Sequence, residues 1–515
     1  MENMPHCHAP GGLMSGIPDW LYYASIVIVM LISFIILEVF RKRSSDSMEY
    51  KKFELTRFRI VRFFFKSRAV QFSIRFIVTA FFFLIIYAGF YGNQHPGKNI
   101  APTLTWNLWW IGLIFLILFF GKLWCYACPW DAVTNFMTRL SVFKVKKNTI
   151  NLGWKWPKYF KNIYLAMIFF ILLTWLELGY HVTMSPEATA ALGLIMLSMV
   201  FLPGLLFEKK AFCQYGCLIG RISGLYAMFS PVEVRSRDKG ICKSCKTVDC
   251  YMGNDKGYAC PTNQNLKKMD VNTYCTMCAE CFRTCPSDNV AFNVRPFGKD
   301  LLKTKSFRKD ESYLSIILFS LTAFHGLTMT PVWKIFVQKL QAYFGSGEIT
   351  AFSVGMTICV LIPFILYGLF IYFSKLTANE KGQGFWDLFI KFAYGLLPIA
   401  LFYHIAHNVE HFFMEGQKLV VLISDPFGYG WDLFGTAGMQ LSPILSLQSV
   451  WYIQVILIII GHVFGIIITH KHSYQIFESR SAAIKSQIPM IILMILFSVL
   501  SLWLVAQPME MRTGM

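Results

Sequence analysis

Apolar stretches long enough to cross a membrane dominate this sequence. Runs of about 20 apolar residues, the length that spans a bilayer core as a helix, recur along nearly the whole chain. By that length rule we place about ten spans, at residues 20–40, 70–91, 104–121, 163–180, 190–207, 313–329, 352–373, 388–413, 450–470 and 488–504. Only 15% of the residues are charged and 55% are hydrophobic, which is too apolar for a soluble protein of this size. We therefore expect a mainly α-helical, polytopic membrane protein.

The basic residues predict the orientation of these spans. The net charge of +19 comes from Lys and Arg clustered in alternate loops, which is the positive-inside pattern rather than the single basic face of a nucleic-acid-binding protein. The loop after the first span is rich in both residues, whereas the next loop, 92–103, holds only Lys98. With ten spans, both termini lie outside and the long loop after the fifth span lies in the cytoplasm. The predicted location is the cytoplasmic (inner) membrane, with lipid as a partner and no nucleic acid.

The long hydrophilic loop at residues 231–309 contains eight of the fourteen cysteines. Because the cytoplasm is reducing, cysteines there predict metal ligands rather than disulfides. Four of them form a C-x2-C-x2-C-x3-C-P run, namely Cys275, Cys278, Cys281 and Cys285. In this run three thiolates bind one [4Fe-4S] cube and the fourth reaches a second cube. We expect a small cytoplasmic α+β dicluster ferredoxin module in this loop.

The other four cysteines of the loop supply a second set of three plus one. They are Cys242, Cys245, Cys250 and Cys260, and the last is followed by proline. By the crossing pattern of dicluster ferredoxins, one cube takes Cys275, Cys278, Cys281 and Cys260, and the other takes Cys242, Cys245, Cys250 and Cys285. Zinc is the competing interpretation, because C-x2-C pairs also suit a tetrahedral zinc site. The run that ends in Cys-Pro favours an iron–sulfur cube.

Four further cysteines lie where predicted spans meet the cytoplasm. Cys125 and Cys128 follow the third span, and Cys213 and Cys217 follow the fifth. Both pairs emerge on the same side by the parity of the spans, so their thiols can converge beside the ferredoxin loop. Two interpretations stay open: a third metal site or cluster, and a pair of structural motifs at helix ends.

These motifs resemble those of the polyferredoxin-type 4Fe-4S integral membrane proteins. The resemblance rests on Lys122-Leu-Trp-Cys125-Tyr-Ala-Cys128-Pro129-Trp130, on Phe212-Cys213-Gln-Tyr-Gly-Cys217 and on the dicluster loop. That group includes NapH-like quinol dehydrogenase subunits, the C-terminal half of NosR-like regulators, CcoG-like copper-handling proteins and FesM-like proteins. The resemblance covers about residues 70–310, and the total length is most similar to that of the FesM-like proteins. It implies quinone-linked electron transfer at a membrane.

Histidines mark the predicted helices after residue 310. His404, His407 and His411 share one helical face at i, i+3 and i+7, and His325 lies in the preceding part of this region. His325 and His404 each lie about 20 Å above the cytoplasmic edge at 1.5 Å per residue. Neutral imidazoles at matched depth suit the two axial positions of a b-type haem. Interhelical hydrogen bonding, quinone binding and a copper or other metal site are the alternatives.

The sequence thus predicts three regions and one general activity. The regions are N-terminal membrane helices with membrane-edge cysteines, the ferredoxin module and C-terminal membrane helices with histidines, at 1–230, 231–309 and 310–515. We expect a membrane-bound electron-transfer protein, an oxidoreductase subunit linking a soluble redox partner or subunit to quinone, haem or an outward acceptor. The alternatives from other classes are a metal-maturation or transport factor and a redox sensor.

Overall fold

Helices make up most of the computed structural model, which describes residues 18–41, 52–141, 144–145, 149–380 and 383–507. The long helices are α1 (Asp19–Arg41), α3 (Arg68–Tyr91), α5 (Ile111–Phe120), α8 (Tyr164–Gly179), α9 (Pro186–Leu206), α16 (Lys309–Thr328), α17 (Pro331–Phe344), α18 (Glu348–Ala378), α20 (Leu396–Glu415), α22 (Leu447–Ile476) and α23 (Arg480–Ala506). The shorter ones are α2 (Arg59–Lys66), α4 (Ile100–Pro102), α6 (Trp124–Ala127), α7 (Pro129–Arg139), α10 (Ala211–Tyr215), α11 (Leu218–Tyr226), α12 (Lys239–Ser244), α13 (Asp249–Met252), α14 (Glu280–Thr284), α15 (Lys299–Lys303), α19 (Phe385–Ala393) and α21 (Lys418–Ser424).

The ten predicted spans all fall on helices, but fewer helices qualify as spans. Among the described residues, eight are long and apolar enough to cross a membrane, or nine if α16 and α17 form one span bent by 90°. The bend occurs where Pro331 follows Thr330, because proline cannot continue a helix in its interior. The fourth predicted span, α8, has 16 residues. That is about 24 Å of helix, shorter than a bilayer core of about 30 Å.

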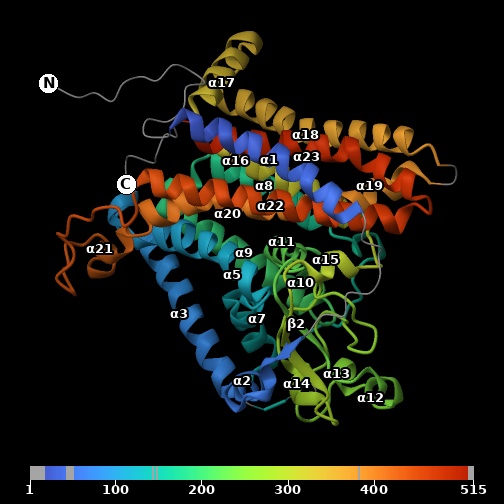
Figure 1. Ribbon diagram of the computed structural model, residues 1–515. Helices are drawn as coiled ribbons and strands as arrows, with labels where there is room; N and C mark the ends of the chain where they lie inside the picture. Colours follow the sequence, from blue (N-terminus) through green and yellow to red (C-terminus); the bar gives the residue numbers. More distant parts are fainter. Residues whose placement is uncertain (1–17, 42–51, 142–143, 146–148, 381–382, 508–515) are drawn as a thin grey trace.

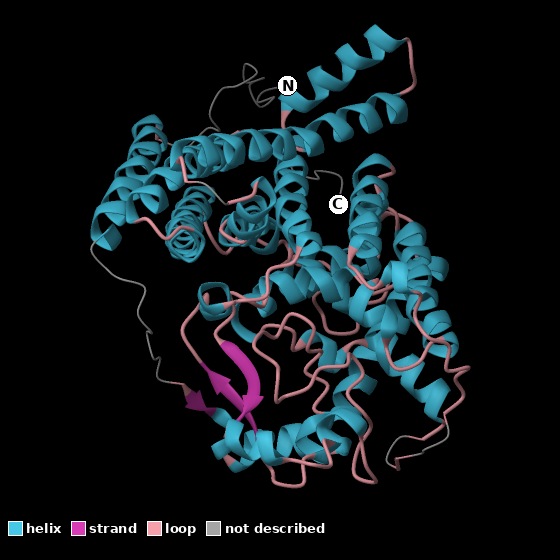
Figure 2. Cartoon of the chain, turned by 90° about the vertical axis from the view of Figure 1, so that its right-hand side faces the viewer, coloured by secondary structure: helices cyan, strands magenta, loops and turns pink. Residues whose placement is uncertain are grey.

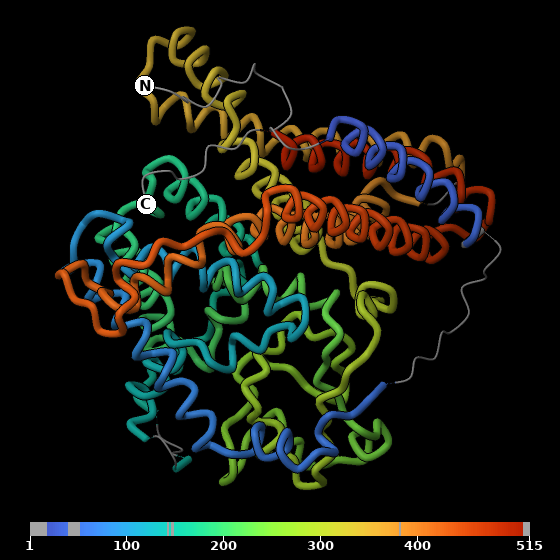
Figure 3. Tube along the Cα trace, turned by 60° about the vertical axis from the view of Figure 1, so that its left-hand side comes forward, coloured from blue at the N-terminus to red at the C-terminus, as the bar shows by residue number. Residues whose placement is uncertain are grey.

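The C-terminal helices pack around α20. Nearly every residue of α20 is buried, and α22 runs alongside it. The first helix of the chain, α1, lies against α22 and α23, so the two ends of the described chain meet in one helical layer (Figures 1 and 3). The predicted location of both termini concerns residues outside the described part of the chain.

A small three-stranded sheet organises the cysteine-rich module. Its strands are β1 (Phe53–Glu54), β2 (Val232–Ser236) and β3 (Val290–Val294), in the order β1-β3-β2 and all antiparallel to their neighbours. The cysteine loop runs out between β2 and β3, so the sheet holds both ends of that loop together. Figure 2 shows the sheet apart from the layer of long helices.

The module has its own apolar core, and that core includes residues from far along the chain. Phe65 of α2 stacks on Phe282 of α14, with ring centroids 5.0 Å apart, and lies 4.9 Å from Phe292 of β3. The predicted boundaries at 231–309 omit this contribution, because β1 and α2 come from the loop between α1 and α3. The module is also held to α3, because Arg283 of α14 donates a 2.8 Å hydrogen bond to Gln71 of α3.

Candidate metal centres

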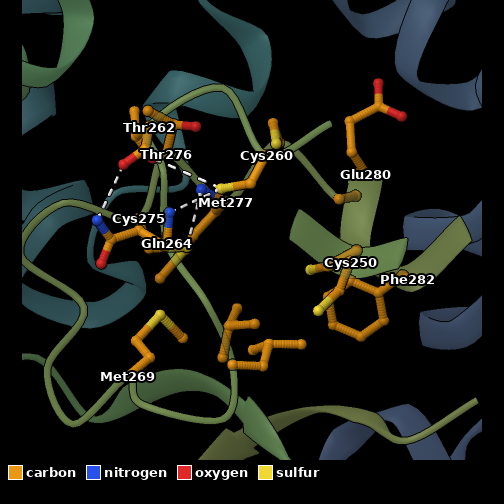
Figure 4. Close-up of a pocket in the computed structure, with 15 residues that line it drawn as sticks. Cys250, Cys260, Thr262, Gln264, Met269, Cys275, Thr276, Met277, Glu280 and Phe282 are labelled. Atoms are coloured by element: carbon orange, nitrogen blue, oxygen red, sulfur yellow. Dashed lines mark hydrogen bonds between the residues drawn. The ribbon is translucent and has the colours of Figure 1, made fainter. Parts of the chain in front are cut away.

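The first of three cysteine pockets, called site A here, is formed by the ferredoxin run. Its lining includes the four cysteines assigned to one cube, Cys260, Cys275, Cys278 and Cys281. Figure 4 shows Cys260 and Cys275 around this pocket, with Cys250 on its far side. Backbone N–H groups point at the sulfurs: Met277 donates to Cys275 over 3.4 Å, and Gln264 donates to Cys260 over 3.2 Å. Such donors stabilise the anionic form of a thiol.

The backbone of the run is shaped to wrap a compact group. Met277 and Ala279 both have positive φ angles, 49° and 65°, a conformation that non-glycine residues adopt rarely. Met277 lies between Cys275 and Cys278, and Ala279 lies between Cys278 and Cys281, so the chain turns between successive cysteines that line the pocket.

Site B is the second pocket, and its lining includes the other predicted set, Cys242, Cys245, Cys250 and Cys285. Asn289 donates hydrogen bonds to two of these sulfurs. Its backbone N–H donates to Cys285 over 3.2 Å, and its side-chain amide donates to Cys242 over 3.4 Å. A backbone hydrogen bond from Val248 lowers the pKa of Cys245, which favours the thiolate that binds iron.

Site C is formed by the membrane-edge cysteines. Cys125, Cys128, Cys213 and Cys217 line one pocket together with Trp130, Asp131 and Lys210. Cys128 and Cys217 are the N-caps of α7 and α11, and the Gly220 N–H lies 3.3 Å from the Cys217 sulfur. Burial raises the pKa of Cys217 to about 11 and raises the pKa of Cys213 further. A metal bound at site C would therefore displace protons from these thiols.

The three sites follow one another. Cys250 lines both site A and site B, and Thr276 lines both site A and site C. Site A is thus the middle of a continuous series that begins in the loop between β2 and β3 and ends at the helices α6, α7, α10 and α11.

Two buried cations lie between site A and site C. Lys122 is fully buried and Arg221 is 2% exposed. Both donate to the Thr273 carbonyl, over 3.2 Å and 3.3 Å, and the electrostatic neighbours of Lys122 include the thiols of Cys125, Cys275 and Cys217. Nε and Nη1 of Arg221 have no hydrogen-bond partner among the described residues.

These features fit an iron–sulfur cube better than zinc. A tetrahedral zinc ion with Zn–S bonds of about 2.3 Å brings its ligand sulfurs within about 3.8 Å of one another. Within the described residues, no three His, Cys, Asp or Glu side chains are grouped to hold one metal ion. In each site at least four thiols line one pocket, and a cube binds each of four thiolates at a separate iron corner. The buried cations suit either group, because four thiolates around a zinc ion or around a [4Fe-4S] core carry net negative charge.

The predicted haem ligands are not paired with each other. The His325 ring lies 4.9 Å from that of His407, whereas Nδ1 of His404 lies 3.5 Å from the Tyr226 hydroxyl. A Cβ on Gly326 would meet the Tyr403 hydroxyl at 2.5 Å, so α16 and α20 touch at this level. The described residues therefore do not fit a haem held by His325 and His404, and the function proposed below involves no haem.

The histidines of α22 form hydrogen bonds between helices. His462 lies 2.7 Å from Ser33 of α1 and 2.9 Å from Ser498 of α23. His472 lies within 3.0 Å of the carbonyl of Lys391 and 2.8 Å of that of Leu301. These contacts match the alternative of interhelical hydrogen bonding.

Comparison with known proteins points to the same chemistry. A family described as a 4Fe-4S binding domain matches residues 102–148 and 189–237. The two matched segments contain the four cysteines of site C and end before Cys242. No curated protein and no solved structure matches the chain. The match supports an iron–sulfur protein of the ferredoxin type, and it covers the four cysteines of site C but none of the cysteines of sites A and B.

The sequence alone does not identify Asp131, Lys122 and Arg221 as residues of these sites. Asp131 forms ion pairs with Arg75, at 3.0 Å, and with Lys210. Lys122 stands in a motif that carries the family resemblance, but no role is predicted for it, and Arg221 lies outside the predicted motifs. The one available signal is that Lys122 precedes Cys125 by three residues at the end of an apolar run, where a lysine is usually taken as an interfacial anchor.

Proposed function

We propose that the protein is a membrane-bound electron-transfer protein with three [4Fe-4S] clusters, which link a soluble cytoplasmic redox partner to an acceptor in the membrane. The supporting observation is the series of three pockets, lined by five cysteines at site A and by four at each of sites B and C, and joined through Cys250 and Thr276. When bound, each cluster supplies a centre that accepts and releases one electron. The thiols of each pocket hold it, and nearby N–H groups stabilise the thiolates.

The partner would bind at site B. Lys267 and Lys268 line this pocket, and both are exposed, as are Lys243 and Lys246. A basic rim of this kind attracts and orients an acidic surface. We propose that the donor or acceptor on this side is an acidic redox protein or subunit.

The membrane acceptor would lie near site C. Val200, which lines the site C pocket, belongs to α9, one of the helices long enough to cross a membrane. Trp124, Trp130 and Ile219 complete an apolar wall. A lipid-soluble carrier of the quinone class suits such surroundings, because it partitions into the bilayer and exchanges electrons there.

Quinone reduction in vesicles tests the proposal. Purified protein is placed in vesicles with a menaquinone, supplied under anaerobic conditions with a reduced plant-type ferredoxin, and the quinol is quantified. We expect quinol from the wild type and from Cys359→Ser, a control in α18 away from the three pockets. The double variant Cys213→Ser/Cys217→Ser should form little quinol while the electron paramagnetic resonance (EPR) signals of sites A and B persist. Quinol formation at the wild-type rate by the double variant would refute the path through site C.

A further inference from the structure

The buried cations Lys122 and Arg221 require a negative partner. A charge taken out of water costs several kcal/mol unless it is paired. Among the described residues, neither side chain forms an ion pair with a carboxylate. Each donates to one neutral carbonyl, that of Thr273, and Arg221 also lies over the Tyr274 ring at 4.4 Å. These contacts leave most of the positive charge uncompensated.

The groups nearest to this charge belong to two different metal sites. Thr273 and Tyr274 directly precede Cys275 of site A. Arg221 lies one helical turn after Cys217, which caps α11 and belongs to site C. The electrostatic neighbours of Lys122 include thiols of both sites. The two cations are therefore shared between site A and site C.

The backbone around two glycines allows Lys122 and Arg221 to approach the Thr273 carbonyl. Gly224 of α11 approaches the Thr273 carbonyl so closely that an added Cβ would clash with it. Lys122 follows Gly121, whose φ angle of +59° is one that glycine adopts readily. Two glycines thus allow α11 and the end of α5 to bring a cation each to the same carbonyl oxygen.

We infer that Lys122 and Arg221 are positioning residues that compensate the negative charge of the clusters at sites A and C and raise the reduction potentials of both. This inference rests on the function proposed above. Four thiolates and a [4Fe-4S] core carry net negative charge, and reduction adds one electron to it. A fixed cation nearby stabilises the reduced form more than the oxidised form. In this step a cluster gains one electron and no proton is transferred. Site B, which lies beyond site A, is outside this influence.

Redox titration followed by EPR tests the inference. Lys122→Gln and Arg221→Gln keep hydrogen-bonding groups but remove the charge. We expect each to lower the midpoint potentials of sites A and C, by about 59 mV for a tenfold change in the ratio of oxidised to reduced sites, and to leave site B unchanged. Lys267→Gln, an exposed lysine at site B, is the matched control and should leave sites A and C unchanged.

The outcomes separate this inference from the proposed function. Unchanged potentials in both variants with all clusters present would overturn the role of the cations. If the glutamine variants fail to assemble a cluster at site C, cluster assembly is measured in the charge-preserving variants Lys122→Arg and Arg221→Lys. Assembly in these two supports the electrostatic role, and failure in them as well contradicts it. Absence of a cluster at site C in the wild type would instead refute the proposed function.

Discussion

Sites B and C each bring four cysteines to one pocket, in contrasting surroundings. Site B is formed by one hydrophilic loop, and exposed lysines line its rim. Site C is formed by two cysteine pairs at separate helix ends, with Trp130, Asp131 and Ile219 in its wall. Backbone hydrogen bonding lowers the pKa of Cys245 in site B, whereas burial raises the pKa of Cys217 in site C.

The contrast between site B and site C suggests that four cysteines can be placed either for exchange with a soluble partner or for electron transfer away from water. An exposed site with a basic rim is suited to exchange electrons with a soluble partner. A site enclosed by helices and charged residues is suited to hold a centre away from water, beside the membrane. Site A joins the two. The experiments below test this difference, beginning with the largest expected effect.

Replacement of Asp131 should damage site C selectively. Its carboxylate faces Arg75 and Lys210, and although burial opposes ionisation, these cations hold the pKa of Asp131 at about 2. Asp131→Asn leaves two cations facing a neutral amide, a change that costs about 3–5 kcal/mol for a buried pair. We expect a lower unfolding temperature in detergent and loss of iron from site C before site B. Glu208→Gln, at an exposed position, is the control.

The difference in unfolding temperature between the wild type and Asp131→Asn should change with pH in a defined direction. Because the folded-state pKa of Asp131 is lowered, its contribution to stability is complete above the unfolded value of about 3.9 and is lost as the pH falls toward the folded value. The difference in unfolding temperature between wild type and Asp131→Asn should therefore be constant from about pH 5 to about pH 8. A difference that disappears within this range would show that the carboxylate is not held by its cations.

Chelation should remove iron from the sites in a fixed order. A water-soluble iron chelator added to the oxidised protein reaches site B through its exposed rim, whereas the wall of site C excludes it. We expect the EPR signal of site B to decline first and that of site C last. Simultaneous decline of both signals would contradict the difference in enclosure.

The smallest effect concerns the basic rim of site B. Lys267→Glu/Lys268→Glu should raise the KM for an acidic donor about tenfold at low salt, with a smaller effect at high salt. Lys158→Glu, a charge reversal at an exposed position outside the three pockets, should leave the KM unchanged. An equal rise in both variants would indicate a general effect of net charge.

The same contrast explains what the sequence could predict. The cysteines of sites A and B lie close together in the chain, so their spacing predicts two sets of four. It does not predict that Cys250, assigned to the second set, also lines the pocket of the first. The helical segments were also predictable, because a continuous apolar run needs no tertiary information. At site C the parity of the spans allows the two cysteine pairs to converge, but it leaves both a metal site and structural motifs open. That they line one pocket depends on where α6, α7, α10 and α11 meet.

Other features depend on packing that no local pattern reports. Matched depth suggested that His325 and His404 share a ligand, but depth says nothing about how α16 and α20 are rotated, and the structure places His407 beside His325. The recruitment of β1 and α2 into the ferredoxin module, and of Lys122 and Arg221 between two sites, likewise requires long-range contacts.

Iron and acid-labile sulfide, measured per chain on anaerobically purified protein, test the central claim most directly. Three [4Fe-4S] clusters predict about twelve of each, falling to about eight in Cys213→Ser/Cys217→Ser. About eight of each in the wild type, unchanged in the double variant, would contradict a cluster at site C and with it the three-site path into the membrane.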